Sequence, residues 1–142
     1  MSIKQVSIFI ENAAGRLAET TKFLADNRIN LRALSIADSQ DFGIVRIICE
    51  NPEEAEQRLK EADFVTTITD VFAVELQDEA GSLSKVLFIL AAAGVSVEYT
   101  YAFLSTKKEG SAYMIFRVND NDAAIQALKD KGIAITSQKD IF

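Results

Sequence analysis

The 142-residue sequence predicts an α+β fold built from two βαββαβ units, each with an antiparallel four-stranded sheet. Two observations lead to this prediction. An alternating apolar segment, a glycine and a helical segment occur near the start of the chain and recur 66 residues later, at Gly15 and at Gly81. In both halves the segments follow the order strand, helix, strand, strand, helix, strand. We therefore expect unit one over residues 1–71 and unit two over residues 72–142.

In the first half of unit one, the sequence predicts a strand, a helix and two further strands. Apolar residues occupy every second position over residues 6–10, which is typical of a half-buried strand. Gly15 separates this strand from a helical segment that runs to about residue 26. Residues 29–36 and 43–49 read as the second and third strands.

The second helix of unit one has a clear start signal. Asn51 is a favourable N-cap residue, and Pro52, the only proline of the chain, suits the first helical position. Glu53 and Glu54 then stand in the first turn, where the helix dipole favours negative charge. Residues 64–71, rich in β-branched side chains, predict the last strand of the unit.

Unit two repeats this order with one change of register. An offset of 66 carries Gly15 to Gly81, whereas an offset of 69 carries Cys49 to Val118, because three residues are inserted in the loop at residues 104–110. A repeat that keeps its pattern across a loop insertion indicates a duplication. Each copy has the split-βαβ order of a ferredoxin-like fold.

Apolar segments suggest burial beyond a single sheet and two helices. Residues 86–90 are apolar all round their helix, so we expect them to be buried on more than the side that faces the sheet. The third strands, at residues 43–49 and near residues 113–116, carry apolar residues on both faces. The chain is therefore expected to form a homo-oligomer.

Composition excludes several classes of function. The net charge of −6 makes the surface a poor match for nucleic acid, whose phosphates require basic patches. The sequence has no histidine and a single cysteine, so we expect no His-ligated metal, no His general base, no internal disulfide and no cofactor. Cys49 lies in an apolar strand and is expected to be a buried, inert thiol. We find no signal peptide and no membrane span, which predicts a soluble, cytoplasmic protein.

The two strand–glycine–helix turns are the candidate sites. A glycine at this point can adopt positive φ, and the free N–H groups of the helix start suit a carboxylate. The alternative is a tight turn with no ligand. The polar residues that recur with each turn are Asn12 and Asp78, three residues before the glycines, and Asn30 and Ser96, at the start of the second strands.

On these residues the sequence resembles a tandem of ACT domains, which are amino-acid-sensing modules of metabolic enzymes and regulators. The family pattern is Asp/Asn-x-x-Gly-x-Leu at the head of the first helix and Gly-Ile/Val-Asn-Ile at the second strand. The matching residues are Asn12-Ala-Ala-Gly15-Arg-Leu17 and Arg28-Ile29-Asn30-Leu31, and then Asp78-Glu-Ala-Gly81-Ser-Leu83 and Gly94-Val95-Ser96-Val97. The usual proline before the glycine is Ala14 or Ala80 here, Arg28 replaces a glycine, and Ser96 replaces an asparagine.

The resemblance implies domains that pair side by side, with an amino acid bound between the glycine turn of one unit and the second strand of the other. Site one would then comprise Asn12, Ala14, Gly15, Arg16 and Leu17 together with Ser96. Site two would comprise Asp78, Ala80, Gly81, Ser82 and Leu83 together with Asn30. Asn12 and Asp78 would accept hydrogen bonds from the ammonium group, more strongly at the charged Asp78.

We therefore expect a non-catalytic regulatory protein that binds a free amino acid and acts through its own assembly or through a separate enzyme or regulator polypeptide. Two alternatives remain open. The first is an assembly or scaffolding module whose turns bind no ligand, which the missing prolines and Ser96 favour. The second is a small enzyme, which is disfavoured because no set of acid–base residues stands together in the sequence.

Overall fold

The fold is described from a computed structural model, which describes residues 2–38, 41–103 and 109–142. The chain divides into two compact units. Lys4–Thr69 form the first, called here the N-terminal unit. Asp70–Phe142, together with the start of the chain, form the second, called the C-terminal unit. Each unit is described by itself.

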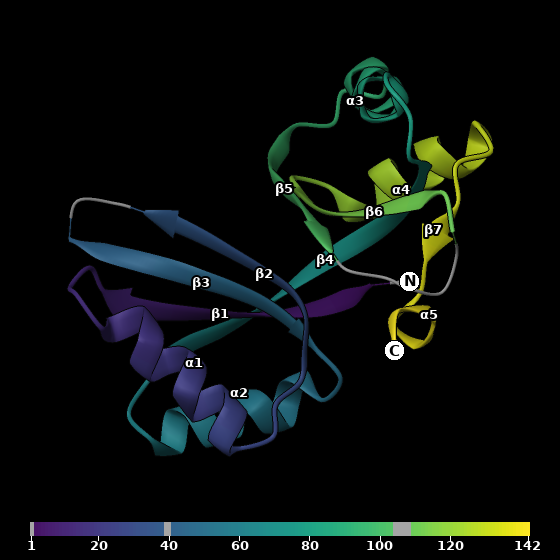
Figure 1. Ribbon diagram of the computed structural model, residues 1–142. Helices are drawn as coiled ribbons and strands as arrows, with labels where there is room; N and C mark the ends of the chain where they lie inside the picture. Colours follow the sequence, from purple (N-terminus) through teal and green to yellow (C-terminus); the bar gives the residue numbers. More distant parts are fainter. Residues whose placement is uncertain (1, 39–40, 104–108) are drawn as a thin grey trace. The chain divides into compact units, whose positions relative to one another are not determined.

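The N-terminal unit is an antiparallel sheet with two helices on one side of it (Figure 1). The sheet order is β2-β3-β1-β4, and β3 pairs antiparallel with both β1 and β2. Only residues 65–69 of β4 belong to this unit. Its elements are β1 (Ile3–Glu11), α1 (Arg16–Asp26), β2 (Leu31–Asp38), β3 (Phe42–Cys49), α2 (Pro52–Glu61) and the beginning of β4 (Val65–Gln77).

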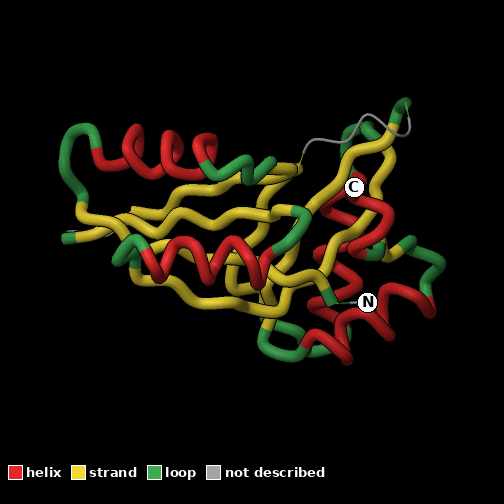
Figure 2. The backbone as a smooth tube through the Cα atoms, turned by 90° about the horizontal axis from the view of Figure 1, so that it is seen from below, coloured by secondary structure: helices red, strands yellow, loops and turns green. Residues whose placement is uncertain are grey.

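The C-terminal unit has the same plan, with the sheet order β7-β4-β6-β5. Its elements are the remainder of β4, α3 (Ser82–Ala92), β5 (Val97–Phe103), β6 (Ser111–Val118), α4 (Asn121–Asp130), β7 (Ile135–Thr136) and α5 (Gln138–Ile141). Short loops join helices to strands in both units (Figure 2). The predicted α+β class with two βαββαβ units and antiparallel sheets is confirmed; the short helix α5 was not predicted.

The duplication is visible in the element bounds. α1 and α3 have the same length, and α3 begins 66 residues after α1, at Ser82 instead of Arg16. α2 and α4 also match in length, and α4 begins 69 residues after α2, at Asn121 instead of Pro52. Residues of the two units therefore correspond position by position.

The core of the N-terminal unit follows from the alternation in β1. Val6, Ile8 and Ile10 all point to the helical side of the sheet and are buried, as their spacing predicts. Leu24 of α1 and Leu59 of α2 are buried against them. This cluster fixes both helices on the sheet through the removal of apolar surface from water.

The C-terminal unit has a core of the same design. Phe72 and Phe116 stack across β4 and β6 with their ring centroids 5.6 Å apart. Val86 and Leu90 of α3 are fully buried. The expectation that residues 86–90 are buried on more than the side facing the sheet is wrong for the single chain, because Leu87 is 36% exposed and Phe88 is 75% exposed. The apolar run of α3 therefore covers the core on one side and leaves a large aromatic ring in water.

No helix in the described ranges has both the length and the apolar character that a passage through a bilayer requires.

Cys49 ends β3 and is buried in the N-terminal core. Burial raises the pKa of its thiol to about 11, against a smaller lowering by the backbone hydrogen bond from Asn51. Only about one molecule in a thousand then carries the reactive thiolate at pH 8.

We predict that iodoacetamide at pH 8 modifies Cys49 at least ~100-fold more slowly in the native protein than in denaturant, because both the low thiolate fraction and burial protect the thiol. Mass spectrometry over a time course measures both rates. Equal rates would contradict the buried position.

Each helix of the N-terminal unit ends on a residue in the left-handed conformation that glycine favours. Arg28 after α1 has a φ of 57°, and Asp63 after α2 has a φ of 67°. The equivalent residues of the C-terminal unit are Gly94 and Gly132, with φ of 72° and 76°. A side chain in this region is strained relative to glycine by roughly 1–2 kcal/mol.

We predict that Arg28→Gly and Asp63→Gly each stabilise the protein by about 0.5–1 kcal/mol, because the relief of strain exceeds the added entropy of glycine in the unfolded chain. Urea unfolding followed by circular dichroism measures the change. A loss of stability in both variants would show that their side chains make contacts that outweigh the strain.

Candidate functional site

The first glycine turn connects β1 to α1. Gly15 has φ 83° and ψ −11°, so the positive φ expected from the sequence is confirmed. A Cβ at this position would meet nothing within 4 Å, which shows that backbone conformation and not space calls for glycine. The N–H groups of Leu17 and Ala18, in the first turn of α1, have no hydrogen-bond partner among the described residues. These two donors point out of the helix start, where the dipole is positive.

Asn12 ties this turn to the end of the β2–β3 hairpin. Its side-chain Nδ2 donates to Asp38 Oδ1 at 2.8 Å, and its backbone N–H donates to the Asp41 carbonyl at 3.5 Å. The side-chain Oδ1 of Asn12 remains as an acceptor. Arg16, by contrast, pairs with Glu19 on the surface of α1 at 2.8 Å. The turn is thus braced by an amide, while the adjacent arginine is engaged along the helix.

A cavity of about 260 Å³ lies beside the first turn. Apolar side chains from β1, α1 and β2 form most of its walls, namely Ile10, Leu17 and Ile36. Asn12 and Asp38 stand with them in the lining. Leu17 and Ile36 are also among the exposed large hydrophobic residues, so this cavity is open and partly apolar.

The second glycine turn repeats the backbone of the first. Gly81 has φ 90° and ψ −11°, and the N–H groups of Leu83 and Ser84 lack partners within the described ranges. The backbone N–H of Asp78 donates to the Gly110 carbonyl at 2.9 Å. Within the same ranges, the exposed carboxylate of Asp78 has no partner, unlike the bonded amide of Asn12.

The surroundings of the second turn are more polar. A cavity of about 530 Å³ is lined by Glu75, Glu79, Ser82, Lys85 and other residues of β4, β6 and the loop before β7. The two turns therefore share backbone geometry and differ in their neighbours. A ligand with an apolar side chain suits the first, and a polar one suits the second.

The two predicted strand residues lie apart from the turn of their own unit. Asn30 and Gly15 stand at opposite ends of α1, whose 11 residues span roughly 16 Å. Ser96 stands likewise beyond the end of α3, and Asn119 binds it from both sides: Oδ1 accepts from the Ser96 N–H at 2.9 Å, and the Asn119 N–H donates to the Ser96 carbonyl at 3.2 Å.

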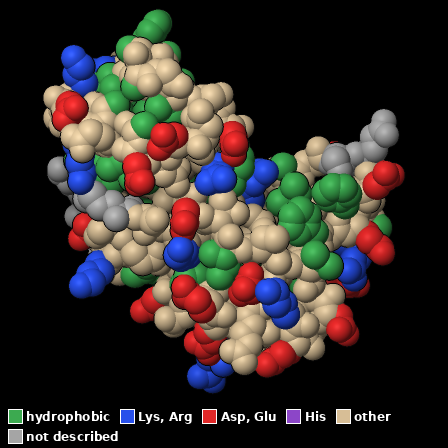
Figure 3. Space-filling view, turned by 180° about the vertical axis from the view of Figure 1, so that it is seen from behind, with side chains coloured by type: hydrophobic (Ala, Val, Ile, Leu, Met, Phe, Trp, Pro, Cys, Tyr) green, Lys and Arg blue, Asp and Glu red, His purple; other side chains and the backbone are tan. Residues whose placement is uncertain are grey.

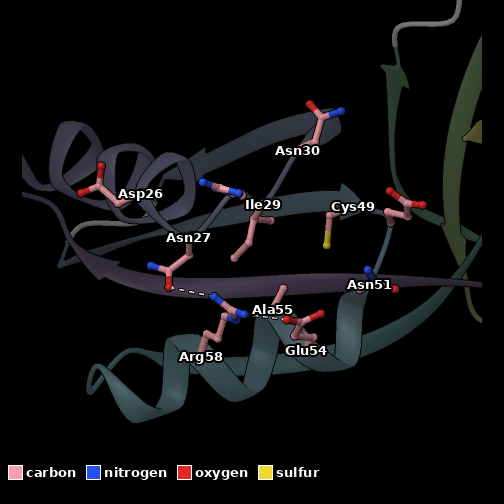
Figure 4. Close-up of a pocket in the computed structure, with 11 residues that line it drawn as sticks. Asp26, Asn27, Ile29, Asn30, Cys49, Asn51, Glu54, Ala55 and Arg58 are labelled. Carbon is pink, nitrogen blue, oxygen red and sulfur yellow. Dashed lines mark hydrogen bonds and ion pairs between the residues drawn. The ribbon is translucent and has the colours of Figure 1, made fainter.

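Asn30 borders a further cavity, of about 320 Å³, that the sequence interpretation missed (Figure 4). The close-up shows Asn27, Glu54 and Arg58 joined by hydrogen bonds on one side, and Asn30 pointing away from them. The usable signal was a difference between the repeats, because Asn27 and Arg58 correspond to Ala93 and Ala127.

On the face drawn in Figure 3, acidic and basic side chains are interspersed and no basic patch forms. Hydrophobic side chains also reach the surface on this face. Within the described ranges, no three His, Cys, Asp or Glu side chains are grouped so that they could hold a metal ion. The groups best placed to hold a small ligand are therefore hydrogen-bond donors and acceptors.

Glycine is the only residue that fits the turn backbone without strain, so we predict that Gly15→Ala and Gly81→Ala each destabilise the protein by roughly 1–2 kcal/mol. Gly43→Ala is the matched control, since Gly43 lies in β3 outside the left-handed region and an added Cβ would make ordinary contacts of 3.6–3.7 Å. Urea unfolding reports all three. Losses that do not exceed that of Gly43→Ala would contradict the role of positive φ.

Comparisons with known proteins agree with this architecture. The family model described as "ACT domain pair" matches residues 1–142. Protein BT0572 from Bacteroides thetaiotaomicron has 41% identity and a TM-score of 0.91, and the match covers 99% of this chain and 96% of that one. A comparison with curated proteins finds no match.

Two more distant solved structures share the fold. The regulatory subunit of aspartate kinase from Thermus flavus has 15% identity and a TM-score of 0.62, with 89% of this chain and 90% of that one covered. The same subunit from Thermus thermophilus, in a ligand free form, has 15% identity and a TM-score of 0.63, with coverage of 89% and 91%.

Proposed function

The chain belongs to the ACT domain pair family, and on that premise we propose that it is a non-catalytic regulatory protein that binds a free amino acid. The observation that carries the proposal is the pair of glycine turns with unpaired N–H groups. Leu17 and Ala18 supply these donors at one turn, and Leu83 and Ser84 supply them at the other. Two adjacent backbone donors at a helix start match the two oxygens of a carboxylate.

The remaining groups at each turn match the other end of an amino acid. An ammonium group carries three donors and needs oxygen acceptors. Asn12 offers its Oδ1, because only its Nδ2 is used by Asp38. Asp78 offers a whole carboxylate, so its bond is charge-assisted and the second turn is the stronger site.

We propose the full set of binding residues that the family pattern implies. At each turn the ligand lies along the backbone that runs from the residue before the glycine to the leucine two residues after it. One residue from a second strand completes each set. The residues are Asn12, Ala14, Gly15, Arg16, Leu17 and Ser96 for one ligand, and Asp78, Ala80, Gly81, Ser82, Leu83 and Asn30 for the other.

Regulation would act through association. A ligand that binds one association state more tightly shifts the equilibrium toward that state. Within the N-terminal sheet, β2 is an outer strand, and its Leu34 and Ile36 are exposed, which suits contact with a second copy of the chain or with a separate enzyme or regulator. The likeness to regulatory subunits of aspartate kinase supports a regulatory role.

One observation favours the alternative of an assembly module that binds no ligand. The bond between Asn12 and Asp38 closes the first turn with groups of the chain itself. A turn whose polar side chain already has a partner gains less from a ligand than the open turn at Asp78. The two functions therefore differ in what the turns bind, and a direct measurement separates them.

We predict that at least one standard amino acid stabilises the protein. At 100 times its dissociation constant a ligand adds about 2.7 kcal/mol, which raises Tm by roughly 5–10 °C for a chain of this size. Thermal shift with each amino acid measures this, and Asp78→Ala should reduce the shift more than Asn12→Ala. Sedimentation with and without the ligand then reports any change in association.

Asp122→Ala provides the matched control, because it removes an exposed acidic group at the start of α4, a helix that no glycine turn precedes. It should keep the full response. If no amino acid raises Tm, the binding function fails and the assembly module becomes the better description.

A further inference from the structure

The cavity of Figure 4 lies wholly within the N-terminal unit, at the opposite end of α1 from Gly15. It has a volume of about 320 Å³, within the range of small-molecule sites. The end of α1, the loop into β2, the end of β3 and the start of α2 surround it, and we call it the α1–α2 cleft.

One wall of the cleft is a closed hydrogen-bond network. Arg58 donates from Nη2 to Glu54 Oε1 at 2.8 Å and from Nη1 to Asn27 Oδ1 at 3.3 Å. Asn27 in turn donates from Nδ2 to the Phe23 carbonyl at 2.9 Å. The charges of Arg58 and Glu54 therefore compensate each other, and Arg58 bridges α2 to the end of α1.

Two charged side chains that line the cleft have no charged partner among the described residues. Asp26 pairs with Lys22 outside the cleft. Arg28 and Glu50 line the cleft, and neither side chain has an ion pair or hydrogen bond to a described residue. The cleft therefore presents one uncompensated positive and one uncompensated negative group to whatever enters it.

The start of α2 adds open backbone donors. Asn51 occupies the N-cap position, but its side chain makes no capping hydrogen bond, which differs from the N-cap expected from the sequence. In the C-terminal unit the equivalent Asp120 does cap, accepting from the Ala123 N–H at 3.0 Å. The N–H of Glu54, which corresponds to Ala123, is left without a partner in the part of the chain that the structure describes.

The second repeat shows that the fold itself does not require these groups. α3 and α4 have the lengths of α1 and α2, and they approach each other more closely. Four polar residues of the cleft are replaced there by small ones: Asn27, Arg28, Glu54 and Arg58 correspond to Ala93, Gly94, Ala123 and Ala127. Glu50 and Asn51 correspond to the polar residues Asn119 and Asp120.

Arg28 is the clearest of these differences. It holds a left-handed φ of 57°, which Gly94 adopts without strain in the other unit. A strained arginine at a position that suits glycine indicates a use for the guanidinium. In the cleft that it lines, the side chains of Arg28 and Glu50, which have no partner among the described residues, stand with the open N–H group of Glu54 at the start of α2.

We propose that the α1–α2 cleft is a separate site for a small zwitterion of the α-amino acid class. Arg28 and the uncapped start of α2 hold its carboxylate, and Glu50 holds its ammonium group. Asn51 supplies further hydrogen-bonding groups. The proposal does not depend on ligand binding at the glycine turns.

Nuclear magnetic resonance of the full chain, labelled with ¹⁵N and titrated with each standard amino acid, tests the proposal. The amides of Arg28, Glu53 and Glu54 report the cleft, and those of Leu17 and Leu83 report the turns. We expect at least one amino acid to shift the cleft amides in a saturable way. Arg28→Gly should weaken that binding at least ~10-fold, since it removes a charged hydrogen-bond donor.

Two controls separate this loss from other effects. Asp63→Gly relieves the same kind of backbone strain in the same unit but lies outside the cleft, so it should bind like the wild type. The double variant Asn12→Ala, Asp78→Ala should keep cleft binding while it loses any binding at the turns. Glu50→Gln should weaken cleft binding as Arg28→Gly does.

The proposal is overturned if no amino acid shifts the cleft amides, or if Arg28→Gly binds with unchanged affinity. Saturable shifts at the cleft with none at the turns would support the cleft and refute the amino-acid site proposed for the turns. Shifts only at the turns would refute the cleft site and support the amino-acid site at the turns. Each proposal can therefore fail without the other.

Discussion

The structure depends on one backbone constraint, the sharp change of direction between a strand and the helix that follows it. In both units a glycine with positive φ makes this change, at Gly15 and at Gly81. Because the turn is made by backbone, no described side chain caps the helix. The N–H groups of the second and third residues of α1 and α3 therefore have no partner among the described residues. The same conformation that lets the helix fold back on the sheet thus creates the donors on which the proposed function rests.

The sequence predicted the fold nearly completely, because the relevant signals are local. The alternation in β1, the glycine turns and the Asn51-Pro52 helix start each depend on a few neighbouring residues. The same order of strand, glycine turn and helix also occurs in both units, so each half supported the prediction for the other. The failures concern contacts. The exposed ring of Phe88 and the uncapped Asn51 could not be foreseen, since each depends on what neighbouring segments cover or leave free.

The candidate site was predictable to a lesser degree. The backbone of both turns followed from glycine, whereas the bond between Asn12 and Asp38 joins residues far apart in the chain and carries no local signal. The α1–α2 cleft was overlooked because acidic residues at the start of α2 have a sufficient explanation in the helix dipole. A position-by-position comparison of the two repeats shows that Arg28 and Arg58 are replaced by Gly94 and Ala127 in the other unit.

The left-handed Arg28 also bears on protein engineering. A consensus of the two repeats, or any redesign that scores backbone compatibility, would place glycine at this position and alanine at the positions of Asn27 and Arg58. Glycine at position 28 would relieve backbone strain, whereas alanine in place of Asn27 and Arg58 would remove the hydrogen bond that joins α2 to the end of α1. The redesigned chain would also lose the polar residues that distinguish one half of the duplicated chain from the other, so making the two halves alike would remove the proposed cleft site.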